Sequence, residues 1–179
     1  MIPLTQSGCN VFTKTFYLAF VAWREARSSK LPDEARLGVM FTLLDRVAHP
    51  KWWGRTTAEC ATKALQFSSL TDPKDKQLTT WPVESDQSWF NCLALAQRVI
   101  YGEADNPVPG ADHYFDDSIT PPDWADPKKI VKRIGRLTFY DLDEDVEAKA
   151  IAAAAPANSA DPFVNELRAF LSAPAGGGA

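Results

Sequence analysis

The strongest constraint in the chain is an apolar run, Phe16 to Ala22, that ends in the charged string Trp23-Arg24-Glu25-Ala26-Arg27. The run is apolar on nearly every side, so it predicts a buried helix, which we expect over residues 13–27. Glu25 would lie near the C-terminal end of that helix, where the helix dipole disfavours an anion. Such a carboxyl group either pairs with an arginine or keeps its proton, and a raised pKa is what a general acid needs. Arg24 and Arg27 favour pairing, so these residues alone leave both interpretations open.

Charge is unevenly distributed along the chain. Residues 141–179 contain seven acidic and two basic side chains, whereas residues 1–140 are nearly neutral. No basic stripe predicts a nucleic-acid partner, and no apolar run of about 20 residues predicts membrane insertion. The N-terminus lacks a basic region before its apolar stretch, so we expect no signal peptide. We expect a catalytic domain over residues 1–140 and an Ala-rich, acidic, helical tail with a flexible end over residues 141–179.

The cysteines and histidines predict no metal centre. Cys9, Cys60 and Cys92 are an odd number without CxxC spacing, which indicates free thiols in a reducing compartment. His49 and His113 are the two histidines of the chain, too few for a His-rich site. We therefore expect no metal and no cofactor.

Capping and periodicity predict the remaining elements. A helix should start near Pro32 and stop before Pro50, and a capping box should open a short helix over residues 56–65. Asp86 should cap a helix over residues 88–101, and residues 71–86 should form a functional loop or small hairpin. β structure is expected at residues 111–115 and as one closing strand at 134–140, and an amphipathic helix should follow Pro162. The core stripe expected on the second helix is Leu37, Met40, Phe41, Leu44 and Val47.

Six short motifs, in order and with fitting spacing over residues 16–140, together resemble the cell wall hydrolases of the spore cortex-lytic enzyme (SleB) type, a family that also supplies phage endolysins. They are Trp23-Arg24-Glu25-Ala26-Arg27, Gly38-Val39-Met40 with Leu43-Leu44-Asp45-Arg46-Val47, Gln66-Phe67-Ser68, Gly110-Ala111-Asp112-His113-Tyr114, Pro122-Asp123-Trp124-Ala125, and Ile134-Gly135 with Phe139-Tyr140.

The resemblance implies a fold and a reaction. The fold would be α+β, mainly helical and lysozyme-like, with a small β element lining a cleft. The enzyme would cleave the bond between N-acetylmuramic acid and N-acetylglucosamine in peptidoglycan, most simply as a lytic transglycosylase that forms 1,6-anhydromuramic acid. Glu25 would be the catalytic acid. Substrate binding would fall to Gln66, Ser68, Asp112, His113 and Tyr114.

Four positions depart from the family pattern. The glycine before the glutamate is Arg24 here, the asparagine before Arg-Val is Asp45, the tryptophan that often follows Gln-Phe-Ser is Ser69, and the threonine before His-Tyr is Asp112. If the Asp112 carboxylate faces Glu25, it would supply a water-activating base and the enzyme would be a hydrolytic muramidase.

Three alternatives stay open from sequence. Glu103, in Tyr101-Gly102-Glu103-Ala104, also resembles the catalytic string, but it falls where the family carries a non-catalytic glutamate. A cysteine amidase would pair Cys60 or Cys92 with His113, although neither cysteine begins a helix. A non-catalytic peptidoglycan-binding or virion protein on the same scaffold would explain the departures.

The resemblance also sets the biological expectation. A phage endolysin without a signal peptide would accumulate in the host cytoplasm before lysis and reach the periplasmic or extracellular cell wall through a separate membrane protein. Its partner would be the peptidoglycan glycan strand, and we expect a monomer.

Overall fold

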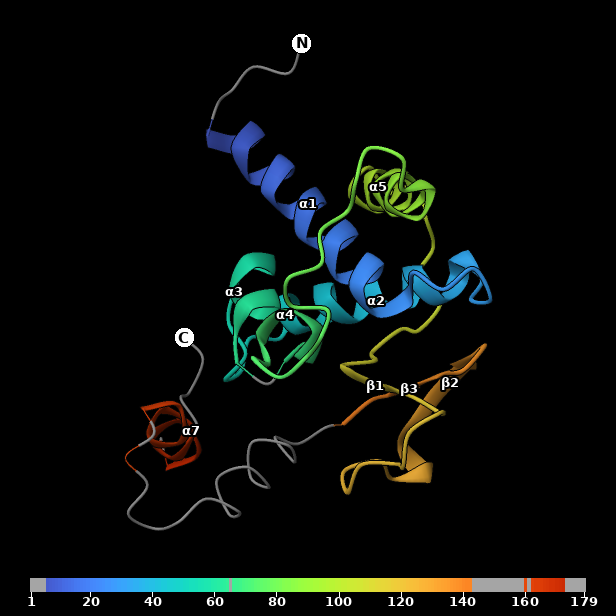
Figure 1. Ribbon diagram of the computed structural model, residues 1–179. Helices are drawn as coiled ribbons and strands as arrows, with labels where there is room; N and C mark the ends of the chain where they lie inside the picture. Colours follow the sequence, from blue (N-terminus) through green and yellow to red (C-terminus); the bar gives the residue numbers. More distant parts are fainter. Residues whose placement is uncertain (1–5, 65, 143–159, 161, 173–179) are drawn as a thin grey trace. The chain divides into compact units, whose positions relative to one another are not determined.

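The computed structural model describes residues 6–64, 66–142, 160 and 162–172. Contacts divide the chain into two compact units, residues 1–141 and residues 142–179. The first unit contains five helices and a small antiparallel sheet within its described residues, and the second contains α7 (Pro162–Ser172) (Figure 1). The α+β, mainly helical class expected from the sequence is confirmed. The Ala-rich stretch 145–155 lies outside the described residues.

Helix α1 (Gln6–Ala26) is the core helix of the first unit. It packs against α2 (Asp33–Ala48), α3 (Thr57–Thr62), α4 (Ser68–Thr71) and α5 (Gln87–Ile100) (Figure 1). Leu18, Ala19, Val21 and Ala22 have no exposed surface, as the apolar run predicts. The expected start at residue 13 is wrong, because the helix already includes Gln6. Polar residues such as Thr13 and Lys14 are exposed on this first half, so the core does not dictate where the helix begins.

Local caps set the other helix ends. Pro32 precedes α2, Asp33 and Glu34 occupy its first turn, and the helix ends at Ala48. The Thr56 side chain accepts from the Glu59 amide at the start of α3. Asp86 accepts from the amides of Ser88 and Trp89 and so begins α5.

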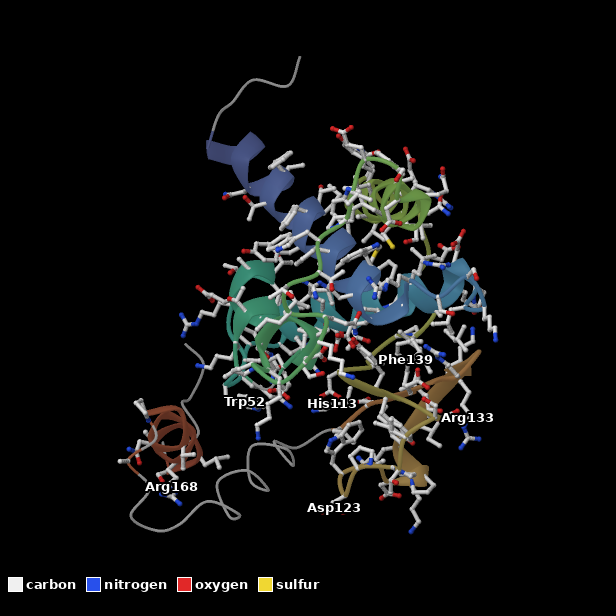
Figure 2. The ribbon with its side chains drawn as sticks, in the orientation of Figure 1. Trp52, His113, Asp123, Arg133, Phe139 and Arg168 are labelled. Atoms are coloured by element: carbon white, nitrogen blue, oxygen red, sulfur yellow. The ribbon has the colours of Figure 1, made fainter. Side chains whose placement is uncertain are left out.

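The apolar stripe expected on α2 is shifted. Met40 is fully buried, but Leu37, Phe41, Leu44 and Val47 are only partly buried. The buried face includes Gly38, because its missing Cβ leaves room for the Phe139 ring: a Cβ there would lie 2.6 Å from Phe139 Cζ. Figure 2 shows Phe139 between α2 and the sheet. Residues buried on α2 are Ala35, Arg36, Gly38, Val39, Met40, Thr42, Leu43 and Arg46.

The sheet has the order β1-β3-β2, from β1 (His113–Asp116), β2 (Ile130–Ile134) and β3 (Leu137–Tyr140). A short 3-10 turn, Pro127–Lys129, precedes β2. The single closing strand expected at residues 134–140 is wrong. Gly135 has a φ of 62°, so the chain turns there and Ile134 pairs with Leu137 in an antiparallel hairpin. The register shifts between Ile130 and Lys132, whereas β1 pairs regularly with β3 from His113–Tyr140 to Asp116–Leu137.

No helix within the described ranges combines the length and apolarity needed to cross a membrane.

Candidate active site

Glu25 is the penultimate residue of α1. Its neighbours Arg24 and Ala26 are 3% and 1% exposed, while the Glu25 side chain keeps a partial opening to solvent. Burial raises the pKa of the Glu25 carboxyl, and this is the largest influence on it. The group therefore retains its proton at a higher pH than an ordinary glutamate.

Two hydroxyl groups face the Glu25 carboxyl. Ser69 Oγ, from α4, donates a hydrogen bond to Glu25 Oε1. The Tyr114 hydroxyl, from β1, is close enough to lower the pKa of Glu25, but it is buried and forms no hydrogen bond of ordinary geometry. Burial and the neighbouring Glu25 raise the pKa of Tyr114 well above its usual value, so the phenol stays neutral. Both hydroxyls are placed to stabilise the Glu25 carboxylate once its proton has left.

Arg46 and Asp75 shift the pKa of Glu25 in opposite directions. The Arg46 guanidinium lowers the pKa of the carboxyl, and the Asp75 carboxylate raises it. Asp75 lies in the loop after α4, where its Oδ1 accepts from the Gln77 amide at 2.8 Å. Asp112 raises the pKa of Asp45. Asp75 is thus a carboxylate whose charge reaches Glu25.

Arg46 ties three parts of the site together. Its Nε donates to the Asp112 carbonyl at 2.6 Å and its Nη1 donates to Gln66 Oε1 at 2.6 Å. The guanidinium also lies over the rings of Trp53 and Phe67, 5.5 and 5.3 Å from their centroids. The side-chain carbonyl of Gln66 accepts this hydrogen bond from Arg46. The side-chain amide nitrogen of Gln66 is buried and has no hydrogen-bond partner.

His113 is held in an aromatic and acidic environment. Its Nδ1 lies 2.8 Å from Asp112 Oδ1, and its ring centroid lies 5.1 Å from Trp124 and 6.1 Å from Trp53. Lys51 Nζ is 4.0 Å from the other Asp112 oxygen. His113 and Asp112 are 3% and 6% exposed, so little of either side chain is open to a substrate.

The motif residue Ser68 is exposed at the first position of α4. The serine that contacts the acid is the next one, Ser69, which is 2% exposed. Sequence reasoning missed Ser69 and Asp75. A signal for Ser69 existed, because it is the position at which the chain departs from the family tryptophan.

Arg24, at the position where the resemblance predicts glycine, joins two loops to α1. Its Nη1 donates to the Ser69 carbonyl at 3.2 Å and its Nη2 to the Leu78 carbonyl at 3.3 Å. The guanidinium lies over the Phe20 and Trp23 rings, 4.9 and 5.6 Å from their centroids. Arg24 thus fixes the backbone of the serine whose hydroxyl bonds Glu25.

The rival catalytic groups lie in unsuitable surroundings. Glu103 is exposed beyond the end of α5, where the Arg98 side chain binds its carbonyl. Cys60 and Cys92 are free and fully buried, and burial raises the pKa of Cys60 to about 11 and that of Cys92 to about 12. Neither thiol is a ready nucleophile near neutral pH.

Comparison with known proteins identifies the family. The model of the Cell Wall Hydrolase family matches residues 31–140, more than half of the chain. The chain therefore belongs to the cell wall hydrolases, enzymes that cleave peptidoglycan. The matched segment contains Arg46, Gln66, Ser69 and Tyr114 but begins after Glu25. No curated protein and no solved structure matches the chain.

Proposed function

We propose that this cell wall hydrolase is a glycosidase in which Glu25 is the general acid, acting on the bond between N-acetylmuramic acid and N-acetylglucosamine. The observation that carries the proposal is the environment of Glu25. Its carboxyl group is buried at the end of the core helix, has a raised pKa, and meets the hydroxyls of Ser69 and Tyr114. A carboxyl group that keeps its proton to higher pH than an ordinary glutamate, with donors ready for its anion, suits leaving-group protonation.

The first step is protonation of the glycosidic oxygen. Glu25 donates its proton as the bond between the muramic acid C1 and that oxygen breaks. The carboxylate left behind accepts from Ser69 Oγ, and the Tyr114 hydroxyl is the second available donor. Arg46 adds positive charge that favours the same anion.

The second step distinguishes a lytic transglycosylase from a hydrolase. In the transglycosylase that we propose, the Glu25 carboxylate takes the proton of the muramic acid 6-hydroxyl as its oxygen bonds to C1. The product is 1,6-anhydromuramic acid, and Glu25 regains its proton without using water. A single carboxyl group is sufficient for both steps.

Hydrolysis is the second candidate, and Asp75 is the observation that favours it. A hydrolytic muramidase needs a second carboxylate to activate water or stabilise the sugar cation. Asp112, considered for this role from sequence, is instead bound to His113. Asp75 acts on the pKa of Glu25 and lies in the loop that Arg24 holds through Leu78.

Gln66 and Tyr114 remain our proposed substrate-binding residues: the Gln66 amide nitrogen has no hydrogen-bond partner, and the Tyr114 hydroxyl lies beside the acid at which the bond is cleaved. We propose supporting roles for the other motif residues. Asp112 and His113 would hold the wall of the site through Arg46 and Trp124, and the exposed Ser68 would reach substrate only at the rim.

The test is mass spectrometry of peptidoglycan digested by the wild type, Glu25→Gln and Glu103→Gln. We expect anhydro-muropeptides from the wild type and from Glu103→Gln, and about 10²–10⁴-fold less product from Glu25→Gln. Reducing-end products would keep Glu25 as the acid and establish hydrolysis, and Asp75→Asn would then be tested. Full activity of Glu25→Gln would refute the assignment, and binding of peptidoglycan without any turnover by the wild type would support the non-catalytic scaffold.

The endolysin setting is a further part of the proposal, and it rests on the family resemblance. In that setting the monomeric enzyme accumulates in the host cytoplasm and lyses the cell only when a pore-forming protein opens the membrane. Expression with and without such a protein, followed by culture turbidity, tests it. Lysis without the pore former would contradict this setting.

A further inference from the structure

Trp81 is an exposed tryptophan in the loop between α4 and α5. Its side chain is 62% exposed, although an indole is a large apolar group that proteins usually cover. One face of the ring is stacked on Phe20, with the centroids 5.0 Å apart and the planes 16° apart. Because that face is covered, the opposite face is the one available to a ligand.

The loop that carries Trp81 is fixed to α1 at both ends. Arg24 Nη2 donates to the Leu78 carbonyl at 3.3 Å, and Trp23 Nε1 donates to Asp86 Oδ2 at 2.8 Å. Turn hydrogen bonds run from the Thr80 amide to Gln77 and from the Asp86 amide to Val83. The indole plane is therefore held in place before any ligand arrives, so little entropy is lost on binding.

The same residues connect this plane to the catalytic acid. Trp23 and Arg24 immediately precede Glu25, and Phe20 lies five residues before it, about 7.5 Å along the helix axis and about 140° around it. Arg24 holds the Ser69 carbonyl as well as the Leu78 carbonyl, and Ser69 bonds Glu25. A polymer bound at Glu25 extends beyond the cleaved bond, and the loop that carries Trp81 is joined through Arg24 to the segment that carries Ser69.

We propose that the free face of Trp81 is a saccharide-binding subsite for the peptidoglycan glycan strand, away from the cleaved bond. This inference rests on the proposed glycosidase function. A pyranose ring carries C–H groups of slight positive character on its faces, and these complement the negative face of an indole. The exposed loop side chains near Trp81 carry both signs, with Lys76 and Glu84 on either side in sequence, which favours a neutral sugar ring over an anionic membrane surface.

Binding has to be measured without cleavage, so each variant is made in the Glu25→Gln background. The probes are insoluble peptidoglycan in a sedimentation assay and soluble glycan fragments in calorimetry. We expect Trp81→Ala to weaken binding about five- to tenfold and Trp81→Phe to weaken it less. Tyr101→Ala is the matched control, because Tyr101 is also 62% exposed but lies at the end of α5, and it should bind as tightly as the parent. Circular dichroism and melting temperature verify that each variant is folded.

Unchanged binding by folded Trp81→Ala would overturn the subsite, as would an equal loss in Tyr101→Ala. Loss of binding to vesicles of anionic phospholipid, with glycan binding intact, would assign Trp81 to a membrane surface and also overturn it. Failure of the proposed glycosidase function can be told apart from failure of the subsite. If the glycosidase function is wrong, the enzyme with Glu25 intact will release no glycan product. If it releases product while Trp81→Ala binds normally, only the subsite is wrong.

Discussion

Replacing Arg24 by methionine tests whether the buried guanidinium holds the site together. The substitution removes two hydrogen bonds, of 3.2 and 3.3 Å, to the carbonyls of Ser69 and Leu78. A hydrogen bond from a charged donor contributes about 1.5–3 kcal/mol, and these long bonds belong at the lower end. Lost contact with the Phe20 and Trp23 rings adds about 1 kcal/mol. Methionine keeps an unbranched apolar stem and a helix propensity close to that of arginine.

Part of this loss is recovered, because methionine does not require burial of a charge. Arg24 Nε is buried without a partner, and burial lowers the pKa of Arg24, both signs of a desolvation cost. Relief of one unpaired buried donor is worth about 1–3 kcal/mol. We therefore expect Arg24→Met to lower the free energy of unfolding by about 2 kcal/mol, which is a large fraction of the stability of a small domain.

Urea unfolding at neutral pH, followed by tryptophan fluorescence, measures this difference. Arg27→Met is the matched control: Arg27 lies 4.9 Å from the Trp23 ring centroid, is only half-buried, and should cost about 0.5–1 kcal/mol. An Arg24→Met protein as stable as Arg27→Met, or more stable than the wild type, would refute the reasoning. It would mean that the desolvation cost of the guanidinium exceeds what its carbonyl and ring contacts return.

The remaining predictions concern protons and thiols. Ser69→Ala removes a donor that lowers the pKa of Glu25, so the high-pH limb of the activity profile should move to higher pH; a limb that stays or moves down would contradict the acid role. Because the pKa of Glu25 is raised in the folded protein, the folded state holds this proton at pH values where the unfolded chain, with a glutamate pKa of about 4.3, has lost it. The contribution of Glu25 to stability therefore falls as the pH rises through the window from about 4.3 to the folded pKa. Glu25→Gln lacks this titration, and its melting temperature relative to wild type should increase across that window; a constant difference would argue against burial as the cause. Iodoacetamide near neutral pH should leave Cys60 and Cys92 unmodified in the folded protein, as checked by mass spectrometry of peptides, whereas rapid labelling with loss of activity would revive the amidase alternative.

Features governed by near neighbours were predictable. The helix from Asp33, the Thr56 cap and the Asp86 cap all depend on hydrogen bonds within a few residues, which the sequence displays directly. The placement of Glu25 near the end of a buried helix was predictable for the same reason, since the apolar run and the charged string are adjacent.

Features governed by packing between elements were not predictable from the sequence. The α2 stripe was displaced because α1, α3 and α5 all contact that helix, so its buried face is wider than one periodic row and includes Arg36 and Arg46. The strand Ile130–Ile134 was missed because its exposed Lys132 and Arg133 hide the alternation, and only pairing with β3 makes it a strand.

By itself, the sequence determined that a glutamate would stand at the end of a buried helix, and its motifs indicated the cell wall hydrolase family. It left open whether that glutamate is an arginine's partner or an acid. The tertiary structure supplies what bears on this choice, because the raised pKa of Glu25 depends on desolvation and on Ser69, Asp75 and Tyr114, which lie 44 or more residues away along the chain. Arg24, the neighbour that favoured pairing, interacts electrostatically with Glu25 but donates its hydrogen bonds to the carbonyls of two loops. Electrostatic environment is a property of what surrounds a group in space, and local sequence contains little of it.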